Sequence, residues 1–294
     1  MLKSLCVLTF AASACASTLS QPAVKPLLDL RGGAYPPPKA GYHALAAKGA
    51  AASSLPVVPN LLSGSLAGCY VAFGAILSIT IASGISVEGM PGVQKLVFGA
   101  LFPIALLNII ATGSQLFTGN TASVAAAYYE GLIEPSALIR NWVVTYAGNL
   151  LGSLVFAWAI KYSGLLTGTT AKMAAKITAA KCGGAFGPTV MKGILANWLV
   201  CLAAFMATVE SDLAGKIVGV WFPISAFVMI GLEHSIANLF LLPLGMMAGA
   251  EQTAMDVIMK NVVPVTIGNI IAGAVVFAAS YSFLYGGLGG HKKD

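Results

Sequence analysis

The arrangement of hydrophobic residues divides the chain into a polar leader and a series of long apolar runs. From Leu61 onward, these runs reach or exceed the roughly 20 residues that a helix needs to cross a lipid bilayer. They lie at Leu61–Ser86, Lys95–Glu130, Ala137–Tyr162, Val190–Val209, Lys216–Met247 and Val262–Tyr285. The pattern therefore predicts an all-α membrane protein with six transmembrane helices.

Two of the predicted spans are too long for one crossing and contain polar interruptions. The second is interrupted within TGSQLFTGNTAS (Thr112–Ser123), and the fifth within GLEHSIAN, which begins at Gly231. Lipid offers no hydrogen bonds, so backbone that leaves a helix at membrane depth must be buried in protein or line a cavity. We therefore expect helices 2 and 5 to be interrupted beside a pore.

The two halves of the apolar region resemble each other. TYAGNLLGSLVF (Thr145–Phe156) is similar to TIGNIIAGAVVF (Thr266–Phe277), and their Gly-Asn pairs lie about 120 residues apart. Thr118 and His234, in the two interruptions, are separated by nearly the same interval, so the two breaks fall at matching places. Each repeat would contain three spans, which is an odd number, so the two halves would cross the membrane in opposite directions as inverted repeats. Interrupted helices at equivalent positions of such repeats mark a substrate path.

Composition excludes a soluble protein. Hydrophobic residues make up 57% and charged residues 9% of the 294 residues, and the mean hydropathy is +0.85. Soluble chains typically carry about 25% charged residues. The net charge of +6 is no evidence for nucleic-acid binding, because the basic residues are scattered. We expect no metal and no cofactor, and inert thiols at Cys69, Cys182 and Cys201.

The N-terminal region has the composition of a targeting sequence. Residues 1–17 have a basic start, an apolar stretch and small residues near Ala16, as in a signal peptide. Residues 18–59 are rich in Ala, Ser and Pro and poor in acids, and resemble a plastid transit peptide. We expect a plastid envelope protein, with a transport domain at 60–286 and a tail at 287–294. A secreted leader with a disordered tail, and a plasma-membrane location, are the alternatives.

Polar residues within the fifth span are the main candidates for function. Ionisable residues in hydrocarbon are costly and usually mark a functional site. His234 could donate a proton or a hydrogen bond to a passing anion, or it could be a structural histidine. Asn238 lies four residues further on, on the same helix face, which we expect to line the pore. Glu233 needs a partner or a proton, because an unpaired carboxylate there would be costly and would repel an anion.

Charge near the pore mouth could concentrate anions. Lys161, Lys172, Lys176 and Lys181 make the connection between the third and fourth spans basic, with no acid between them. Such a cluster attracts anions to a pore mouth, or is simply a solvated loop. We also expect the helix-terminal amides at the break that contains His234 to point into the cavity and attract an anion.

Four segments resemble signature motifs of the formate/nitrite transporter family. They are LFTGN (Leu116–Asn120), KGILANWLVCLAAFMA (Lys192–Ala207), WFPISAFVMIGLEHSIANLF (Trp221–Phe240) and PVTIGNIIAGAV (Pro264–Val275). The resemblance extends from Asn60 to Tyr285. It implies an aquaporin-like fold, a homopentamer with one pore per protomer, and transport of small monovalent weak-acid anions. Gly119 departs from the serine usual in the family, which removes any hydroxyl contact from that position.

The resemblance also implies roles for individual residues. His234 matches the central pore residue, Thr118 faces it, and Lys181 becomes the candidate partner of Glu233. Three apolar residues match the constrictions, although each could be simple core packing; they are Phe102, Leu116 and Phe227. Structural or pore-lining polar positions are Asn149, Asn197 and Asn269. In the implied mechanism an anion gains a proton at or near His234 and crosses the dry constriction as a neutral acid.

Rival functions lack their expected residues. A water or glycerol pore of the aquaporin family carries twin Asn-Pro-Ala signatures, and the chain has no Asn-Pro dipeptide. An ammonium channel would have paired pore histidines, and a membrane-embedded metal enzyme would need several ligands. We therefore predict a transporter and not an enzyme. Its partners would be lipid, protons and nitrite or formate, with lactate as a further candidate. A plastid location favours nitrite, which plastids reduce. The mechanism could be proton symport or a pH-gated anion channel. The alternative function is efflux or uptake of formate or lactate at another membrane.

Overall fold

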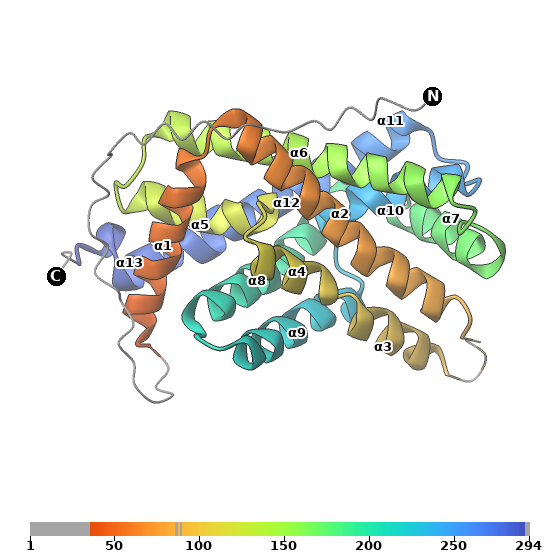
Figure 1. Cartoon of the computed structure of the whole chain (residues 1–294), viewed down its shortest axis with the longest axis horizontal. Coiled ribbons are helices and arrows are strands. Elements are labelled where there is room, and N and C mark those ends of the chain that lie inside the picture. Colours follow the sequence, from red (N-terminus) through yellow and green to blue (C-terminus); the bar gives the residue numbers. More distant parts are fainter. Residues whose placement is uncertain (1–35, 86–87, 89, 292–294) are drawn as a thin grey trace, which may run out of the picture. The chain divides into compact units, whose positions relative to one another are not determined.

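The computed structural model describes residues 36–85, 88 and 90–291, and this part of the chain is helical (Figure 1). The expected signal peptide and residues 18–35 lie outside it. The first half contains α1 (Pro38–Ser54), α2 (Val57–Ala82), α3 (Pro91–Leu101), α4 (Ile104–Thr112), α5 (Phe117–Tyr129) and α6 (Pro135–Tyr162). The second contains α7 (Gly168–Cys182), α8 (Phe186–Val209), α9 (Leu213–Ile230), α10 (Ser235–Met247), α11 (Ala254–Val257), η1 (Ile258–Val262), α12 (Val263–Ile270), η2 (Ile271–Ala279), α13 (Ser280–Tyr285) and η3 (Gly287–Gly289).

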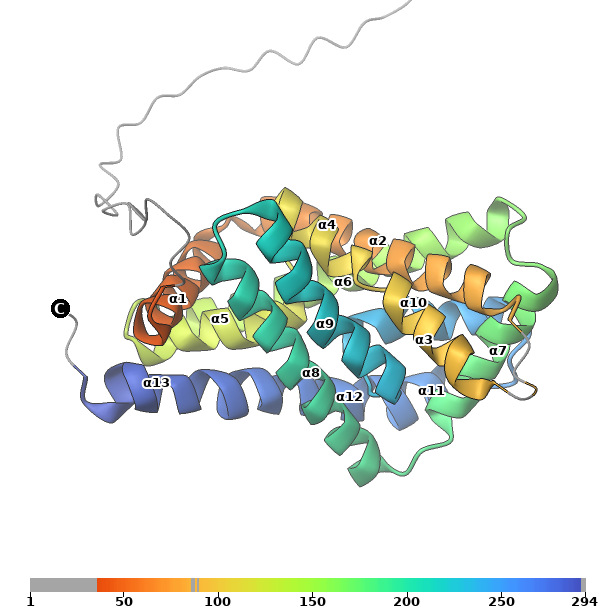
Figure 2. The same ribbon diagram turned by 90° about the horizontal axis from the view of Figure 1, so that it is seen from below.

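Six helical segments in the described part are long and apolar enough to cross a membrane, as the sequence predicts. They are Val57–Ala82, Gly92–Thr112, Pro135–Tyr162, Phe186–Val209, Leu213–Ile230 and Ala254–Tyr285. The last begins eight residues before the predicted start, because Thr253 and Asp256 form a capping box that begins a helix there. Figure 2 shows α11 to α13 as one long helical rod.

The two interruptions have the same local structure. Gly113 and Gly231 end α4 and α9 in the left-handed conformation, with φ of 68° and 84°. In each case the next residue donates its amide to a carbonyl five residues back, Ser114 to Ile109 and Leu232 to Phe227, both at 3.0 Å. This is the Schellman arrangement that glycine favours. Helix resumes at Phe117 and at Ser235, so each break is short.

Pairs of glycines allow the helices of each half to cross closely. A Cβ added at Gly64 of α2 would lie 3.2 Å from Cα of Gly148 of α6. A Cβ added at Gly193 of α8 would also lie 3.2 Å from Cα of Gly268 of α12. Close backbone contact between small residues is typical of membrane helix packing. The two crossings are equivalent, which supports the predicted repeat.

Helix α1 corrects the expectation that residues 18–59 lie outside the fold. Tyr42 of α1 is fully buried and donates its hydroxyl hydrogen to Glu130 Oε1 at 2.9 Å. Gly49 packs directly against the backbone of Ser123. The Ala-rich sequence that resembles a transit peptide is, from Pro38 onward, a helix of the bundle. At the other end, Gly287 donates its amide to Glu130 Oε1 at 3.0 Å, so the expected tail begins in contact with the bundle.

The basic connection between the third and fourth spans is also a helix and not a loop. It forms α7, whose Ala174 and Thr178 pack under Gly245 of α10. Helix α1 packs against α5 and α7 packs against α10, and Figures 1 and 2 place these two pairs at opposite ends of the bundle.

Candidate functional site

His234 lies at the second helix break, and each of its ring nitrogens takes part in a hydrogen bond. It is the N-cap of α10, and its Nδ1 accepts the amide hydrogen of Ala237 at 3.0 Å. Its Nε2 lies 2.9 Å from Oγ1 of Thr118, on α5. The ring is 4% exposed and stacks on Phe227, with centroids 5.6 Å apart. The predicted pairing of His234 with Thr118 is therefore present.

These two contacts determine which ring nitrogen carries the hydrogen. Nδ1 accepts an amide hydrogen, so in the neutral ring the hydrogen must be on Nε2. Nε2–H then donates to Thr118, whose own hydroxyl hydrogen can turn toward another acceptor. A second proton on Nδ1 would break the bond to Ala237, which as a helix cap contributes about 1 kcal/mol.

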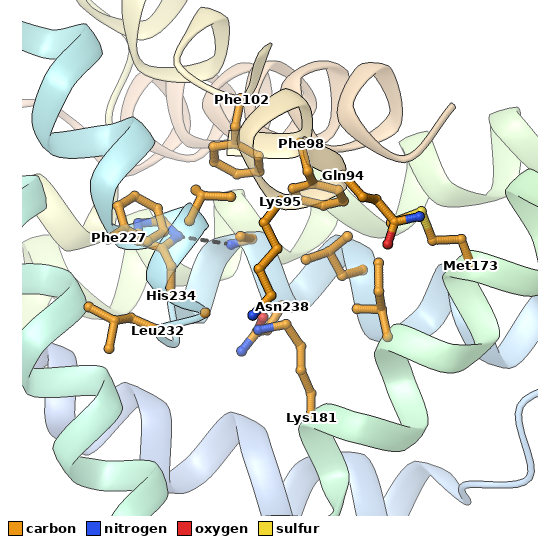
Figure 3. Close-up of a pocket in the computed structure, with 15 residues that line it drawn as sticks. Gln94, Lys95, Phe98, Phe102, Met173, Lys181, Phe227, Leu232, His234 and Asn238 are labelled. Atoms are coloured by element: carbon orange, nitrogen blue, oxygen red, sulfur yellow. Dashed lines mark hydrogen bonds between the residues drawn. The ribbon is translucent and has the colours of Figure 1, made fainter. Parts of the chain in front are cut away.

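Three cavities follow one another along the bundle, and His234 borders two of them. Vestibule A, which contains Lys95 and Lys181, has a volume of about 200 Å³ (Figure 3). Vestibule B, which contains Lys48 and Gln115, has a volume of about 370 Å³. The chamber between them, which contains His234, measures about 10 Å³. That is about the space of one water molecule, so an ion cannot cross with its hydration shell.

Apolar side chains separate the chamber from each vestibule. Phe102, Phe227 and His234 line both vestibule A and the chamber. The rings of Phe102 and Phe227 meet edge to face, with centroids 6.0 Å apart.

On the other side, the chamber and vestibule B share Leu106, Ile109 and Leu116. The three residues predicted as constrictions therefore lie at the narrowings. Leu106 and Ile109 were not predicted, because an apolar residue on an apolar helix gives no sequence signal of its own.

Glu233 turns away from the chamber and is held by three donors. Its Oε2 accepts hydrogen bonds from Lys181 Nζ at 2.8 Å, Asn238 Nδ2 at 2.7 Å and Asn261 Nδ2 at 3.3 Å. The side chain of Lys181 is 19% exposed and that of Glu233 6%. The predicted ion pair is present, and Asn238 lines vestibule A while bonding Glu233. Asn261 was missed, since it is 28 residues from Glu233 in the sequence.

Two asparagines satisfy the backbone at the breaks. Asn149 Oδ1 accepts the amide of Phe117 at 2.9 Å, and Asn269 Oδ1 accepts the amide of Ser235 at 2.8 Å. With Ala237 bonded to His234, the amides of Phe117, Ser235 and Ala237 already have protein acceptors. The expectation that free helix-terminal amides at the break of His234 attract the anion is therefore wrong for Ser235 and Ala237.

Asn197, on α8, connects α5 and α12 by hydrogen bonds next to the site. Its Nδ2 donates to the carbonyl of Asn269 at 2.7 Å, to Thr121 Oγ1 at 3.0 Å and to the carbonyl of Thr118 at 3.3 Å. Gly119, on the neighbouring turn, borders vestibule B, and a Cβ there would meet no atom within 4 Å.

The structure defines which residues of the two breaks are equivalent. Leu116 and His234 are the N-caps of α5 and α10, so these two residues are equivalent. Thr118 corresponds to Ile236, two residues into the second helix. Thr118 and His234 therefore meet across the site from the two breaks without being equivalent residues. The site is consequently asymmetric, with histidine at one break and leucine at the other.

The lysines that line the cavities differ from those expected. Of the basic residues between the third and fourth spans, Lys181 lines vestibule A, whereas Lys161, Lys172 and Lys176 line neither vestibule. Lys95 and Lys48 line vestibules A and B and were not predicted. Burial among protein atoms, and then the charge of Lys216, lower the pKa of Lys48.

In the described part of the chain, no three His, Cys, Asp or Glu residues lie close enough together to hold a metal ion. The site offers hydrogen-bond donors, apolar narrowings and cationic vestibules. This arrangement suits a path for small anions or their conjugate acids.

Comparison with known proteins agrees with this interpretation. The profile of the family described as "Formate/nitrite transporter" matches residues 39–283, which includes α1. A protein of Methanothermobacter thermautotrophicus named "Probable formate transporter" is 39% identical, over 75% of this chain and 86% of that protein.

Two solved structures are similar over nearly their full length. One, described as "FNT family ion channel", has a TM-score of 0.77 at 30% identity and covers 83% of this chain and 98% of the other. The second, "Pentameric formate channel with formate bound", has a TM-score of 0.71 at 29% identity and covers 78% and 97%. Relatives of this kind are transporters and channels, in agreement with the prediction that the protein is not an enzyme. The chain belongs to the formate/nitrite transporter family.

Proposed function

We propose that the protein carries formate or nitrite across a membrane together with a proton, along the path from vestibule A through the chamber to vestibule B. The observation that carries this proposal is the position of His234. The ring borders the dry chamber, presents Nε2–H toward Thr118, and lies between two apolar narrowings. A site of this kind recognises a small acid by hydrogen bonds and penalises a permanent charge.

The geometry supports entry of the substrate between His234 and Thr118. A carboxylic or nitrous acid placed there replaces their 2.9 Å hydrogen bond with two others. Nε2–H donates to one substrate oxygen, and the substrate O–H donates to Thr118 Oγ1. The neutral acid therefore satisfies both side chains, whereas an anion would bring a charge into a space too small for its water.

The proton step uses both nitrogens of His234. An anion that reaches the ring from vestibule A, which His234 also lines, attracts positive charge and so favours uptake of a proton at Nδ1 with loss of the bond to Ala237. The resulting imidazolium transfers its Nε2 proton to the anion, giving the neutral acid and a neutral ring protonated at Nδ1. In that form the Nδ1 hydrogen faces the amide hydrogen of Ala237, which is unfavourable. Loss of the Nδ1 proton to water and uptake of one at Nε2 restore the starting form.

We further propose that the protein is a homopentamer and that it imports nitrite into the plastid. The pentamer is inferred from the related formate channel, and the location from the composition of residues 18–59, whose last part is folded as α1. Formate or lactate release at another membrane is the second candidate. It is favoured by the related protein of Methanothermobacter thermautotrophicus, which is named as a probable formate transporter.

An uptake panel tests the proposed function. The full chain is reconstituted in liposomes, and initial rates for nitrite, formate and lactate are measured at several external pH values, with empty liposomes as the control. Saturable nitrite or formate uptake that alkalinises the outside supports the proposal. Anion flux without any proton movement would favour a simple anion channel, and absence of flux would contradict the proposal. A fluorescent fusion to the full chain locates the membrane.

A further inference from the structure

The polar network around Glu233 has an uncharged counterpart in the other half of the molecule. Asn238 Nδ2 donates to Glu233 Oε2 and to Asn261 Oδ1, both at 2.7 Å, and Asn261 Nδ2 donates to the carbonyl of Lys181 at 3.0 Å. These bonds connect α7 to the second helix break beside vestibule A.

The same bonds recur beside vestibule B with different residues. Asn120 Nδ2 donates to Gln115 Oε1 and to Asn141 Oδ1, both at 3.0 Å, and Asn141 Nδ2 donates to the carbonyl of Ala52 at 3.0 Å. Gln115 thus occupies the position of Glu233, and Ala52 the position of Lys181. Helix α1 is therefore the structural counterpart of α7.

The two networks differ in charge, but neither of them adds net charge to its vestibule. Lys181 and Glu233 form an ion pair at 2.8 Å, so together they add no net charge to vestibule A. Their counterparts, Ala52 and Gln115, add none to vestibule B. The remaining lysine among the residues lining vestibule A is Lys95, and the lysine lining vestibule B is Lys48. Neither makes an ion pair within the described residues.

Lys95 is well placed to meet an anion. It is an exposed residue of α3, and Figure 3 shows its side chain extending into vestibule A. Phe98 of α3 and Phe102, its C-cap, follow at the spacing of one helix face and line the same vestibule. This face leads from a free ammonium group at the mouth to the apolar narrowing at the chamber.

We propose that Lys95 is the residue that loads the anion into vestibule A, and that Lys181 is not. This inference rests on the proposed function, because it names how that transporter captures its substrate. A cation with no paired acid attracts an anion, whereas Lys181 is neutralised by Glu233 and fixed by the asparagine network. The ion pair of Lys181 and Glu233 holds α7 to the second helix break. Beside vestibule B, the network of Ala52 and Gln115 holds α1 to the first break without any charge.

The test measures the apparent affinity for formate separately from each face. The full chain is reconstituted in liposomes, and the face that carries vestibule A is identified with an impermeant thiol reagent at an added Ala179→Cys, an exposed position of α7. The variants are Lys95→Gln, its counterpart Lys48→Gln, and Lys181→Ala with Glu233→Gln, which reproduces the uncharged network. Lys172→Gln is the control, since it removes the same charge from an exposed site that lines neither vestibule.

Lys95→Gln should raise KM for formate entering from vestibule A by about tenfold, the lower end of the effect of focused charge on association. Its maximal rate and its KM from vestibule B should change much less. The salt dependence of entry from vestibule A should also weaken, which a purely structural effect would not cause. Lys48→Gln should show the reverse pattern.

The double variant should alter KM from vestibule A less than Lys95→Gln does. The inference is overturned if Lys95→Gln behaves like Lys172→Gln, or if the double variant gives the larger rise in KM. Flux through the wild-type protein tests the proposed function separately. The inference about Lys95 depends instead on how KM for formate differs between the two faces and among the variants.

Discussion

Removal of Lys181 should destabilise the protein more than removal of the negative charge of Glu233. In the folded state the carboxylate is 6% exposed and its Oε2 accepts from Lys181, Asn238 and Asn261. Lys181→Ala leaves that carboxylate buried with two amide donors and no cation. Glu233→Gln instead leaves a lysine that can extend to water along its flexible stem.

The contacts allow the two effects to be estimated. Loss of one partner of a buried pair costs about 3–5 kcal/mol, and the two remaining amides place Lys181→Ala near the lower end, at about 3 kcal/mol. Glu233→Gln should cost about 1 kcal/mol, the value of a typical hydrogen bond. The chain shows that an amide fits such a network, since Gln115 occupies the equivalent position. Because Lys181→Ala strands no charge once Glu233 is neutral, the pair should couple by about 2 kcal/mol.

Free energies of unfolding give the coupling directly. The wild type, both single variants and the double variant are unfolded with denaturant in mixed micelles, and the four values form a double-mutant cycle. The double variant should be destabilised less than Lys181→Ala alone. Equal effects of the two single variants, adding in the double variant, would refute the idea that Lys181 stabilises the Glu233 carboxylate.

Three other properties follow from the same structure. Uptake should rise as external pH falls, because each anion takes a proton with it; a flat profile in a liposome flux assay would contradict this. Phe227→Ala should open the narrowing beside vestibule A and raise lactate uptake relative to formate, measured as a ratio of initial rates; an unchanged ratio would place the size filter elsewhere. Asn269→Ala removes the bonds to Ser235, Gly193 and Glu233 and should cost about 2–3 kcal/mol of unfolding free energy, whereas a loss below about 0.5 kcal/mol would contradict its role at the break.

The membrane spans were predictable because lipid imposes length and apolarity on a crossing helix. The breaks were predictable because polar residues such as Glu233 interrupt an otherwise apolar run. Helices α1 and α7 were not predicted. Both are short and moderately polar, and each is stabilised by contacts with a distant segment, as Gly49 is by Ser123. Composition alone could not distinguish α1 from a targeting sequence.

The candidate site was predicted in part. His234 could be identified as an ionisable residue in an apolar span, and Lys181 was paired with Glu233 through the family resemblance. The counterpart network was not predictable, because Gln115 and Asn141 are ordinary polar residues until the fold brings them together. Lys95 was assigned to the start of a span, which gave no sign that it lines a vestibule.

The most direct test of the account is the proton movement that accompanies anion uptake in His234→Asn. Asparagine is a strong N-cap, so its oxygen can replace Nδ1 as the acceptor for Ala237 and keep α10 intact. Its side chain is too short to present a donor where Nε2 meets Thr118, and it cannot be protonated. His234→Gln is the matched variant, because its amide reaches the position of Nε2 but does not reproduce the cap. We expect liposomes containing His234→Asn to take up formate or nitrite without alkalinising the outside. If they alkalinise it as fast as the wild type, His234 is structural and the proton does not pass through it.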